Sequence, residues 1–218
     1  WCRGRLANTH AEEFGDVSFP LFFEDLPRIT LRDPLARFLG AADGGILEYT
    51  YADAVKLAGH SCPTVASAYL MTRNALRSLY PDPADLPERG GIRVELHEDL
   101  LDGVTGVVAN VLSLLTGATH ESGFKGIGGR FDRRGLMSYG VELPGQVRFS
   151  RTDTGASVTV STRLERIVLD PRIPPLMPRC LHGEATAEEE LLFRSLWQTR
   201  VQTLTEHADD PEIFVVHH

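Results

Sequence analysis

The chain has 218 residues, 42% of them hydrophobic, which is enough to bury one full core. Its formal net charge is -8, from 30 acidic and 22 basic side chains, so the composition argues against a protein that binds nucleic acid or anionic membranes. No apolar run reaches the roughly 18 residues of a membrane span. Three scattered cysteines favour a reducing compartment, so we expect a cytoplasmic protein. The opening WCRGRLANTH has no initiator methionine and leaves secretion open.

Residues 1–45 are expected to form an N-terminal arm and a short helix. The first 29 residues mix glycine, proline and charges around the apolar run FPLFF, which indicates an extended arm that packs against something. Asp33 precedes Pro34, as is typical of a helix N-cap followed by proline in the first turn, and a double glycine ends the pattern.

Residues 46–170 are expected to form an α+β core. ILEYT predicts a strand, and YADAVKLAG predicts a short helix that Thr50 caps and Gly59 ends. After the loop GHSC, the apolar residues of PTVASAYLMTRNALRSLY follow helical spacing. GIRVELH alternates as a strand does, and QVRFS and ASVTVST predict a hairpin joined by RTDTG. LLDGVTGVVANVLSLLTG is apolar almost all round, which predicts a central buried helix.

Residues 171–218 are expected to hold a connector and a C-terminal helix. DPRIPPLMPRCLHG is rich in proline and predicts a connector without regular structure. Thr186 with Glu189 three residues later forms a capping-box pattern, which predicts a long helix. We leave His217 and His218 out of the candidate site, because terminal histidines are also typical of a purification tag. The predicted fold is a single mixed α+β domain with a central buried helix and an antiparallel sheet.

His60 and Cys62 are the first candidates for a functional site. Cys62 precedes a helix, where free N–H groups and the helix dipole stabilise a thiolate. His60 lies two residues earlier in an extended loop, so its ring can point to the same side. A histidine nitrogen and a cysteine sulfur suit zinc, or iron and other borderline metals. The structural alternative is a buried cysteine beside a capping histidine.

Over roughly residues 50 to 165, the chain resembles the FmdE-like family in three segments: GHSCP, DGVTGVVANVLSLLTGAT and QVRFSRTDTGASVTVS. This family comprises one of the subunits of formylmethanofuran dehydrogenase and its stand-alone relatives. The resemblance implies an α+β core that forms a homodimer and binds a transition metal, commonly zinc, near His60 and Cys62. The second motif of the family is matched by Thr116, Gly117 and Thr119, but Ala118 stands where family members usually have their second cysteine. The terminal zinc ribbon of many relatives is absent from this sequence.

His120 and His97 are candidates for a third ligand or a base. His120 lies two residues beyond Ala118, in the loop that the resemblance places near His60, and we rank it first. His97 precedes Glu98, and a nearby carboxylate could orient its ring. Each histidine has a solvated loop residue as its alternative.

Cys180 and His182 repeat the His/Cys spacing in reverse, in the predicted connector. They could join the same metal or the site of a partner subunit, although a solvated loop is the stronger expectation. Cys2 and His10 lie too near the terminus to interpret.

The loop GFKGIGGRFDRRG is a candidate for binding an anionic substrate. Its glycines allow N–H groups to converge on an anion, and its cationic side chains are Lys125, Arg130, Arg133 and Arg134. It lacks the Gly-Lys-Ser/Thr ending of a phosphate loop. The alternative is a surface turn whose arginines pair with carboxylates.

The sequence therefore predicts a metal-dependent enzyme of small-molecule metabolism, of hydrolase or lyase type, acting on a small anionic molecule. His60 and Cys62 are the expected ligands, with His120 as third ligand or base. Bound iron or haem would instead imply redox chemistry. The alternatives are a non-catalytic accessory protein that binds a metal or cofactor, and a metal-free enzyme in which Cys62 attacks while His60 or His120 takes the proton.

Overall fold

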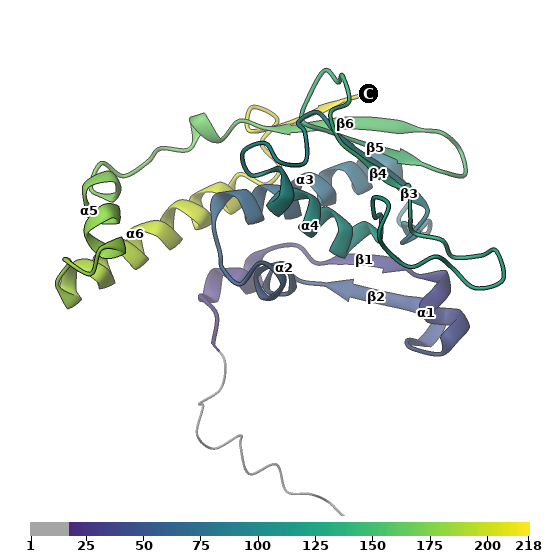
Figure 1. The fold of residues 1–218 in the computed structure, drawn as a ribbon, viewed down its shortest axis with the longest axis horizontal. Helices are drawn as coiled ribbons and strands as arrows, with labels where there is room; N and C mark the ends of the chain where they lie inside the picture. The colour runs from purple at the N-terminus through teal and green to yellow at the C-terminus, as the bar shows by residue number, and fades with distance from the viewer. Residues whose placement is uncertain (1–17) are drawn as a thin grey trace, which may run out of the picture.

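The structure is a computed structural model that describes residues 18–218, and these residues form two β-sheets and six α-helices (Figure 1). The larger sheet contains β3 (Ile92–Leu96), β4 (Met137–Ser138), β5 (Val147–Arg151), β6 (Ser157–Thr162) and β7 (Phe214–His217). The strand order is β4-β3-β5-β6-β7, and every pair of neighbours is antiparallel except β3 and β4. The predicted hairpin is confirmed as β5 and β6.

Helices α3 (Pro63–Leu79) and α4 (Thr105–Thr116) pack under this sheet in Figure 1. Below them lie α2 (Tyr51–Ala58) and the smaller sheet, an antiparallel pair of β1 (Ile29–Arg32) and β2 (Ile46–Tyr49). The remaining elements are α1 (Pro34–Leu39), α5 (Ile173–Leu181), α6 (Ala187–Glu206) and short 3-10 turns at Leu21–Asp25, Asp43–Gly45 and Leu164–Arg166. This layered arrangement confirms the predicted α+β class.

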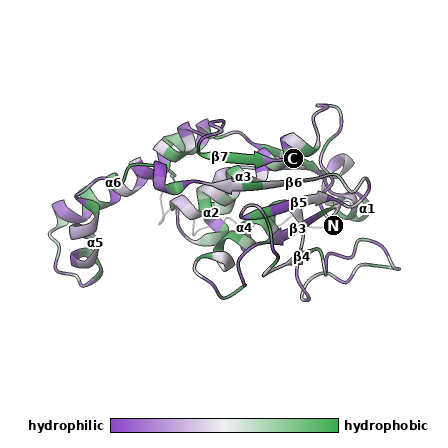
Figure 2. Cartoon of the chain, turned by 90° about the horizontal axis from the view of Figure 1, so that it is seen from above, coloured by the Kyte–Doolittle hydropathy of each residue, from purple (hydrophilic) through white to green (hydrophobic). Residues whose placement is uncertain are grey.

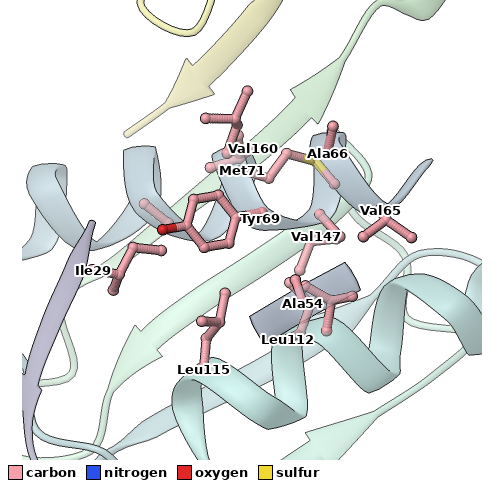
Figure 3. Close-up of a cluster of buried hydrophobic side chains, with 14 of the residues drawn as sticks. Ile29, Ala54, Val65, Ala66, Tyr69, Met71, Leu112, Leu115, Val147 and Val160 are labelled. Carbon is pink, nitrogen blue, oxygen red and sulfur yellow. The ribbon is translucent and has the colours of Figure 1, made fainter. Parts of the chain in front are cut away.

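The hydrophobic core surrounds α3, which lies between the large sheet and the layer of α2. Val65, Ala66 and Tyr69 of α3 are fully buried among residues such as Leu112, Leu115 and Val160 (Figure 3). The helix predicted to be central, α4, exists, but part of its surface stays open, with Asn110 exposed and Val107 and Val108 half-buried. The helix with most buried residues is therefore α3, because it packs against α4 and α6 as well as against the sheet and α2.

Helix starts follow the predicted caps. The Asp33 carboxylate accepts hydrogen bonds from the N–H groups of Leu35 at 2.9 Å and Ala36 at 3.1 Å, and α1 ends at Gly40, before the double glycine. Capping boxes form at the starts of α2 and α6. These contacts span only two or three residues, so sequence alone could predict them.

In the C-terminal region one prediction is wrong and one strand was not predicted. The proline-rich connector contains the helix α5, because Pro174 and Pro175 occupy its first turn, where an N–H would have no partner within the helix. Residues 214–217 form β7 against β6, so His217 belongs to the large sheet. The α5 helix and the start of α6 extend away from the sheet in both views (Figures 1 and 2).

The described part of the N-terminal arm packs as expected. Phe22 and Phe23 are buried, and the ring of Phe23 meets that of Tyr51 edge-on at 4.7 Å between centroids. Cys2 and His10 lie outside the described residues. Within residues 18–218, no helix has the length and apolar character needed to cross a bilayer.

Candidate functional site

His60 and Cys62 occupy different environments at the start of α3. The His60 side chain is exposed, and its Nδ1 lies 2.9 Å from the carbonyl oxygen of Ala58. Cys62 is the N-cap residue of α3, is only 8% exposed and belongs to the hydrophobic core. One side chain of the predicted pair therefore faces solvent while the other is buried.

The loop between them is held by tertiary contacts to Ser61. Its carbonyl oxygen accepts a hydrogen bond from Nε1 of Trp197 on α6 at 3.0 Å. Its hydroxyl lies 3.0 Å from the Tyr51 hydroxyl, and burial raises the pKa of Tyr51. The GHSC loop is thus anchored through its backbone and its serine.

His120 does not complete a metal centre with these residues. Its side chain is exposed, and its ring meets that of Tyr139 at 5.5 Å between centroids. Among residues 18–218, no three His, Cys, Asp or Glu side chains form a group that could hold a metal ion. The side chains of His60, Cys62 and His120, as they are arranged, do not fit such an ion, and we derive no step through one.

Cys180 and His182 lie at the end of α5, in the part of the molecule that projects from the sheet (Figure 1). Cys180 is partly buried and His182 is exposed at the helix C-cap. They belong to a helix and not to the loop that we expected, and the described residues hold no metal-ligand group that includes them.

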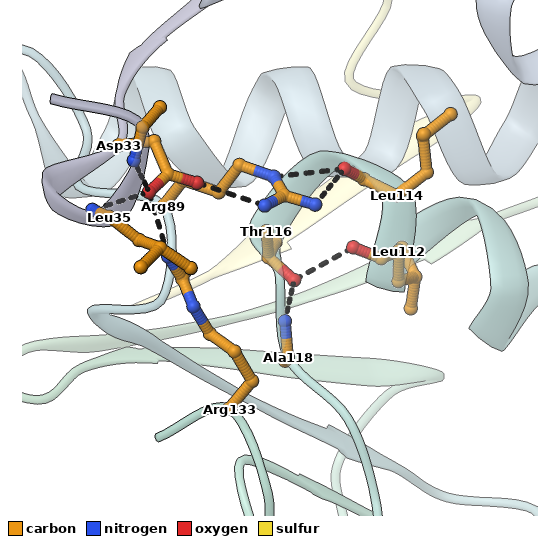
Figure 4. A network of polar contacts seen from close by, with 9 residues as sticks. Asp33, Leu35, Arg89, Leu112, Leu114, Thr116, Ala118 and Arg133 are labelled. Atoms are coloured by element: carbon orange, nitrogen blue, oxygen red, sulfur yellow. Dashed lines mark hydrogen bonds and ion pairs between the residues drawn. The ribbon is translucent and has the colours of Figure 1, made fainter. Parts of the chain in front are cut away.

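The predicted anion-binding loop is partly a structural element. Arg133 is 5% exposed, and its Nη2 donates to the Asp33 carboxylate at 2.8 Å (Figure 4). Arg89 donates to the other carboxylate oxygen at 2.9 Å. We call these three residues the Asp33 cluster. Burial raises the pKa of Asp33, but the hydrogen bonds from Arg89 and Ala36 and the charge of Arg133 outweigh it, so this pKa lies below its ordinary value.

The other cations of the loop are at the surface. Arg134 pairs with Asp132 at 2.7 Å, Lys125 is exposed, and the guanidinium of Arg130 lies over the Phe131 ring at 4.8 Å. A cavity of about 400 Å³ brings Arg130 together with Arg89 and Arg133. Two carboxylates offset these guanidinium groups, Glu88 at the cavity wall and Asp33 beneath it, because Asp132 is already paired with Arg134. The cavity therefore keeps a modest excess of positive charge.

A second cavity, of about 140 Å³, lies where β3 and β6 end and β5 begins, beside the first turns of α3 and α4. We call it the His97 pocket. It is lined by Thr64, Ser67, Met71, Leu96, His97, Glu98, Val104, Thr105, Val108, Gln146, Val147, Thr162 and Leu164.

Hydrogen bonds fix the sheet side of the His97 pocket. The N–H of His97 donates to the carbonyl oxygen of Gln146 at 2.9 Å. The Gln146 side chain bonds both backbone groups of Thr162: its Oε1 accepts from the N–H at 2.8 Å, and its Nε2 donates to the carbonyl oxygen at 3.3 Å. Three strand ends are thereby tied together at one wall.

Two buried hydroxyl groups of this pocket lack partners. Ser67 is 4% exposed and Thr162 is 6% exposed, and neither hydroxyl has a hydrogen-bond partner among the described residues. By contrast, the Thr105 hydroxyl donates to Glu98 at 2.8 Å. An unpaired buried hydroxyl costs about 1–3 kcal/mol, and both oxygens expose less than 1 Å², so they lie behind the surface of the pocket and weaken the fold locally.

From this pocket, sequence reasoning considered only His97 and its neighbour Glu98. Ser67 lies within the apolar stretch VASAYLM and Thr162 within a strand, and neither resembles a motif. The available signal was the spacing of Thr64, Ser67 and Met71, which places these three side chains on one face of the helix. Only the fold shows that Thr162 lies across from this face.

Comparison with known proteins adds no family to this geometry. The sequence matches no family model and no curated protein. The resemblance to the FmdE-like family, with the zinc ion and homodimer that it implies, therefore stays a prediction carried by the sequence motifs.

Proposed function

We propose that the chain is an enzyme of small-molecule metabolism that binds its substrate in the His97 pocket and uses His97 for proton transfer. The observation that carries the proposal is a cavity of about 140 Å³ where three strand ends meet the starts of two helices, with His97 and Glu98 at its mouth.

The volume of the pocket limits the substrate. A dry cavity of about 150 Å³ accommodates a molecule of benzene size, so about 140 Å³ suits roughly six to eight non-hydrogen atoms. The pocket is also open to solvent beside the exposed His97 and Glu98, which leaves room for a larger group at its mouth.

His97 supports acid–base chemistry because an imidazole changes charge near neutral pH. It lies at the end of β3, with its backbone fixed on Gln146, so its ring starts from a defined position at the pocket mouth. Proton transfer by a positioned side chain typically accelerates a reaction by about 10² to 10⁴. Hydrolase and lyase reactions both need such a group.

The competing proposals use Cys62. Its burial in the core argues against a metal-free nucleophile, because a thiol among apolar side chains is unreactive. The metal enzyme and the metal-binding accessory protein are tested by elemental analysis. Stoichiometric zinc or iron that is lost in His60→Ala would favour them over our proposal.

Site-directed variants test the proposed enzyme in a screen of small carbonyl and hydroxyl compounds. We expect His97→Gln to lower kcat by about 10² to 10⁴ with little change in KM. His120→Gln is the matched control, because that histidine is also exposed but lies outside the pocket lining. Equal kcat values for His97→Gln and the unmodified protein would contradict the proposal.

A further inference from the structure

The His97 pocket differs in polarity between its interior and its mouth. Resting on the function proposed above, we infer that the substrate carries an alkyl group of about five or six carbons that fills the interior, while its reacting polar group stays at the mouth beside His97.

The interior of the pocket is walled by apolar side chains. They are Met71, Leu96 and Val147, which are buried, and Val108 and Leu164, which are half-buried. The hydroxyl oxygens of Ser67 and Thr162 expose less than 1 Å² each, so a ligand in the interior does not reach them. The buried Thr105 hydroxyl is already bonded to Glu98, which leaves the hydroxyl of the half-buried Thr64. A polar group that entered the interior would therefore exchange water for mostly apolar contacts, which is unfavourable.

The exposed polar side chains of the pocket lie at its mouth. They belong to His97, Glu98 and Gln146. Val104 is 53% exposed and continues the apolar wall to the surface. The Gln146 amide is already bonded to the backbone of Thr162. An imidazole that titrates near neutral pH and a carboxylate can together meet a reacting group of either charge or of none. The substrate class is therefore defined by its apolar end and the length of that end, and not by its charge.

The volume of the interior sets the length of the alkyl group. Each methylene that moves from water into an apolar site strengthens binding by about three- to fourfold. This gain ends when the cavity of about 140 Å³ is full, because further carbons stay in water. Affinity should therefore rise with chain length and level off at about six carbons. A site that recognised only polar groups would show no such dependence.

Straight-chain alcohols test this dependence, because they are uncharged and differ only in their number of methylenes. We would titrate n-propanol, n-butanol, n-pentanol, n-hexanol and n-heptanol into the full chain and follow binding by NMR. The expected result is an affinity that rises about three- to fourfold per carbon up to n-hexanol and changes about twofold or less beyond it.

Two neighbouring valines on α4 provide matched variants. Val107 and Val108 are both half-buried, but only Val108 lines the pocket. Val108→Phe places an aromatic ring in the cavity and should weaken n-hexanol binding about tenfold or more, whereas Val107→Phe should change it about twofold or less. Leu164→Ala enlarges the cavity, so n-heptanol should then bind about threefold more tightly than n-hexanol. This third variant decides the case if Val108→Phe does not fold.

The inference and the proposed function can fail separately. Affinity that does not grow with chain length, or n-hexanol binding that a folded Val108→Phe leaves unchanged, would overturn the alkyl class. Turnover that requires His97 without any such length dependence would keep the enzyme and remove only this substrate class. Alcohols that bind with the expected length dependence, together with an unchanged kcat in His97→Gln, would keep the apolar pocket and remove the proposed role of His97.

Discussion

The Asp33 cluster and the His97 pocket are two polar regions beside the same core, and they differ in how their polar groups are satisfied. In the cluster, one buried carboxylate receives two guanidinium groups and two backbone N–H groups, while Nη1 of Arg133 has no hydrogen-bond partner among the described residues. In the pocket, two buried hydroxyl groups have no partner within residues 18–218. The buried charges therefore tie distant parts of the fold together, whereas the two hydroxyl groups contribute no hydrogen bond to it.

The GHSC loop differs from the His97 pocket in the same way, in how far its polar groups find partners. The GHSC loop satisfies its polar groups internally, through Trp197 and Tyr51, and buries its cysteine. Regions of this kind should lose stability when they are changed. The pocket should tolerate changes that remove its hydroxyl groups.

The largest expected effect is the loss of Asp33. Asp33→Ala leaves two arginine side chains without their carboxylate and removes the N-cap of α1. We therefore expect the free energy of unfolding to fall by about 3–5 kcal/mol. Chemical denaturation measures this loss. Asp132→Ala is the control, because it breaks an exposed pair with Arg134 and should have a far smaller effect. Similar losses in both variants would contradict the assigned role of the cluster.

The same carboxylate should make stability depend on pH. Because the pKa of Asp33 is lowered in the folded state, its contribution is complete above the unfolded pKa of about 3.9 and is lost as the pH falls through the folded value. The difference in unfolding free energy between the unmodified protein and Asp33→Asn should therefore be constant from pH 7 to about 5 and shrink below about 4. A difference that grew on acidification would have the wrong sign.

A smaller effect is expected where Arg133 packs against a glycine. Gly90 has φ +89°, and a Cβ built there would lie 1.8 Å from Nη1 of Arg133. Gly155 also has positive φ, +74°, but a Cβ there would meet nothing within 4 Å. Gly155→Ala should cost about 1 kcal/mol for backbone strain, and Gly90→Ala about 1–3 kcal/mol more. Equal thermal shifts would show that the guanidinium moves aside freely.

The smallest effect is expected from two matched hydroxyl deletions. Thr116 is fully buried, donates to the carbonyl oxygen of Leu112 at 2.7 Å and accepts from the N–H of Ala118 at 3.2 Å. Thr116→Val should therefore destabilise the fold by about 1 kcal/mol, whereas Thr162→Val should change stability little or raise it slightly. Denaturation midpoints check both. A loss in Thr162→Val as large as that in Thr116→Val would indicate a structural partner for the Thr162 hydroxyl.

The sequence by itself determined most of the local structure. Asp33, Thr50 and Thr186 predicted three helix starts, because their caps involve groups two or three residues away. Alternating and helical apolar spacing predicted β3, β5, β6 and α3 in the same way. The helix α5 was missed because prolines usually signal irregular structure, although they are tolerated in a first turn.

Only the tertiary structure decided which side chains could act. Arg133 belongs to the fold because Asp33 lies 100 residues away in sequence and 2.8 Å away in space. Cys62 is buried while His60 is exposed, although the two are close neighbours in the chain. Ser67 and Thr162 line one pocket because α3 packs against β6. A sequence shows which polar groups a chain carries, but whether each one finds a partner depends on burial and long-range contacts, and those are fixed only when the layers pack.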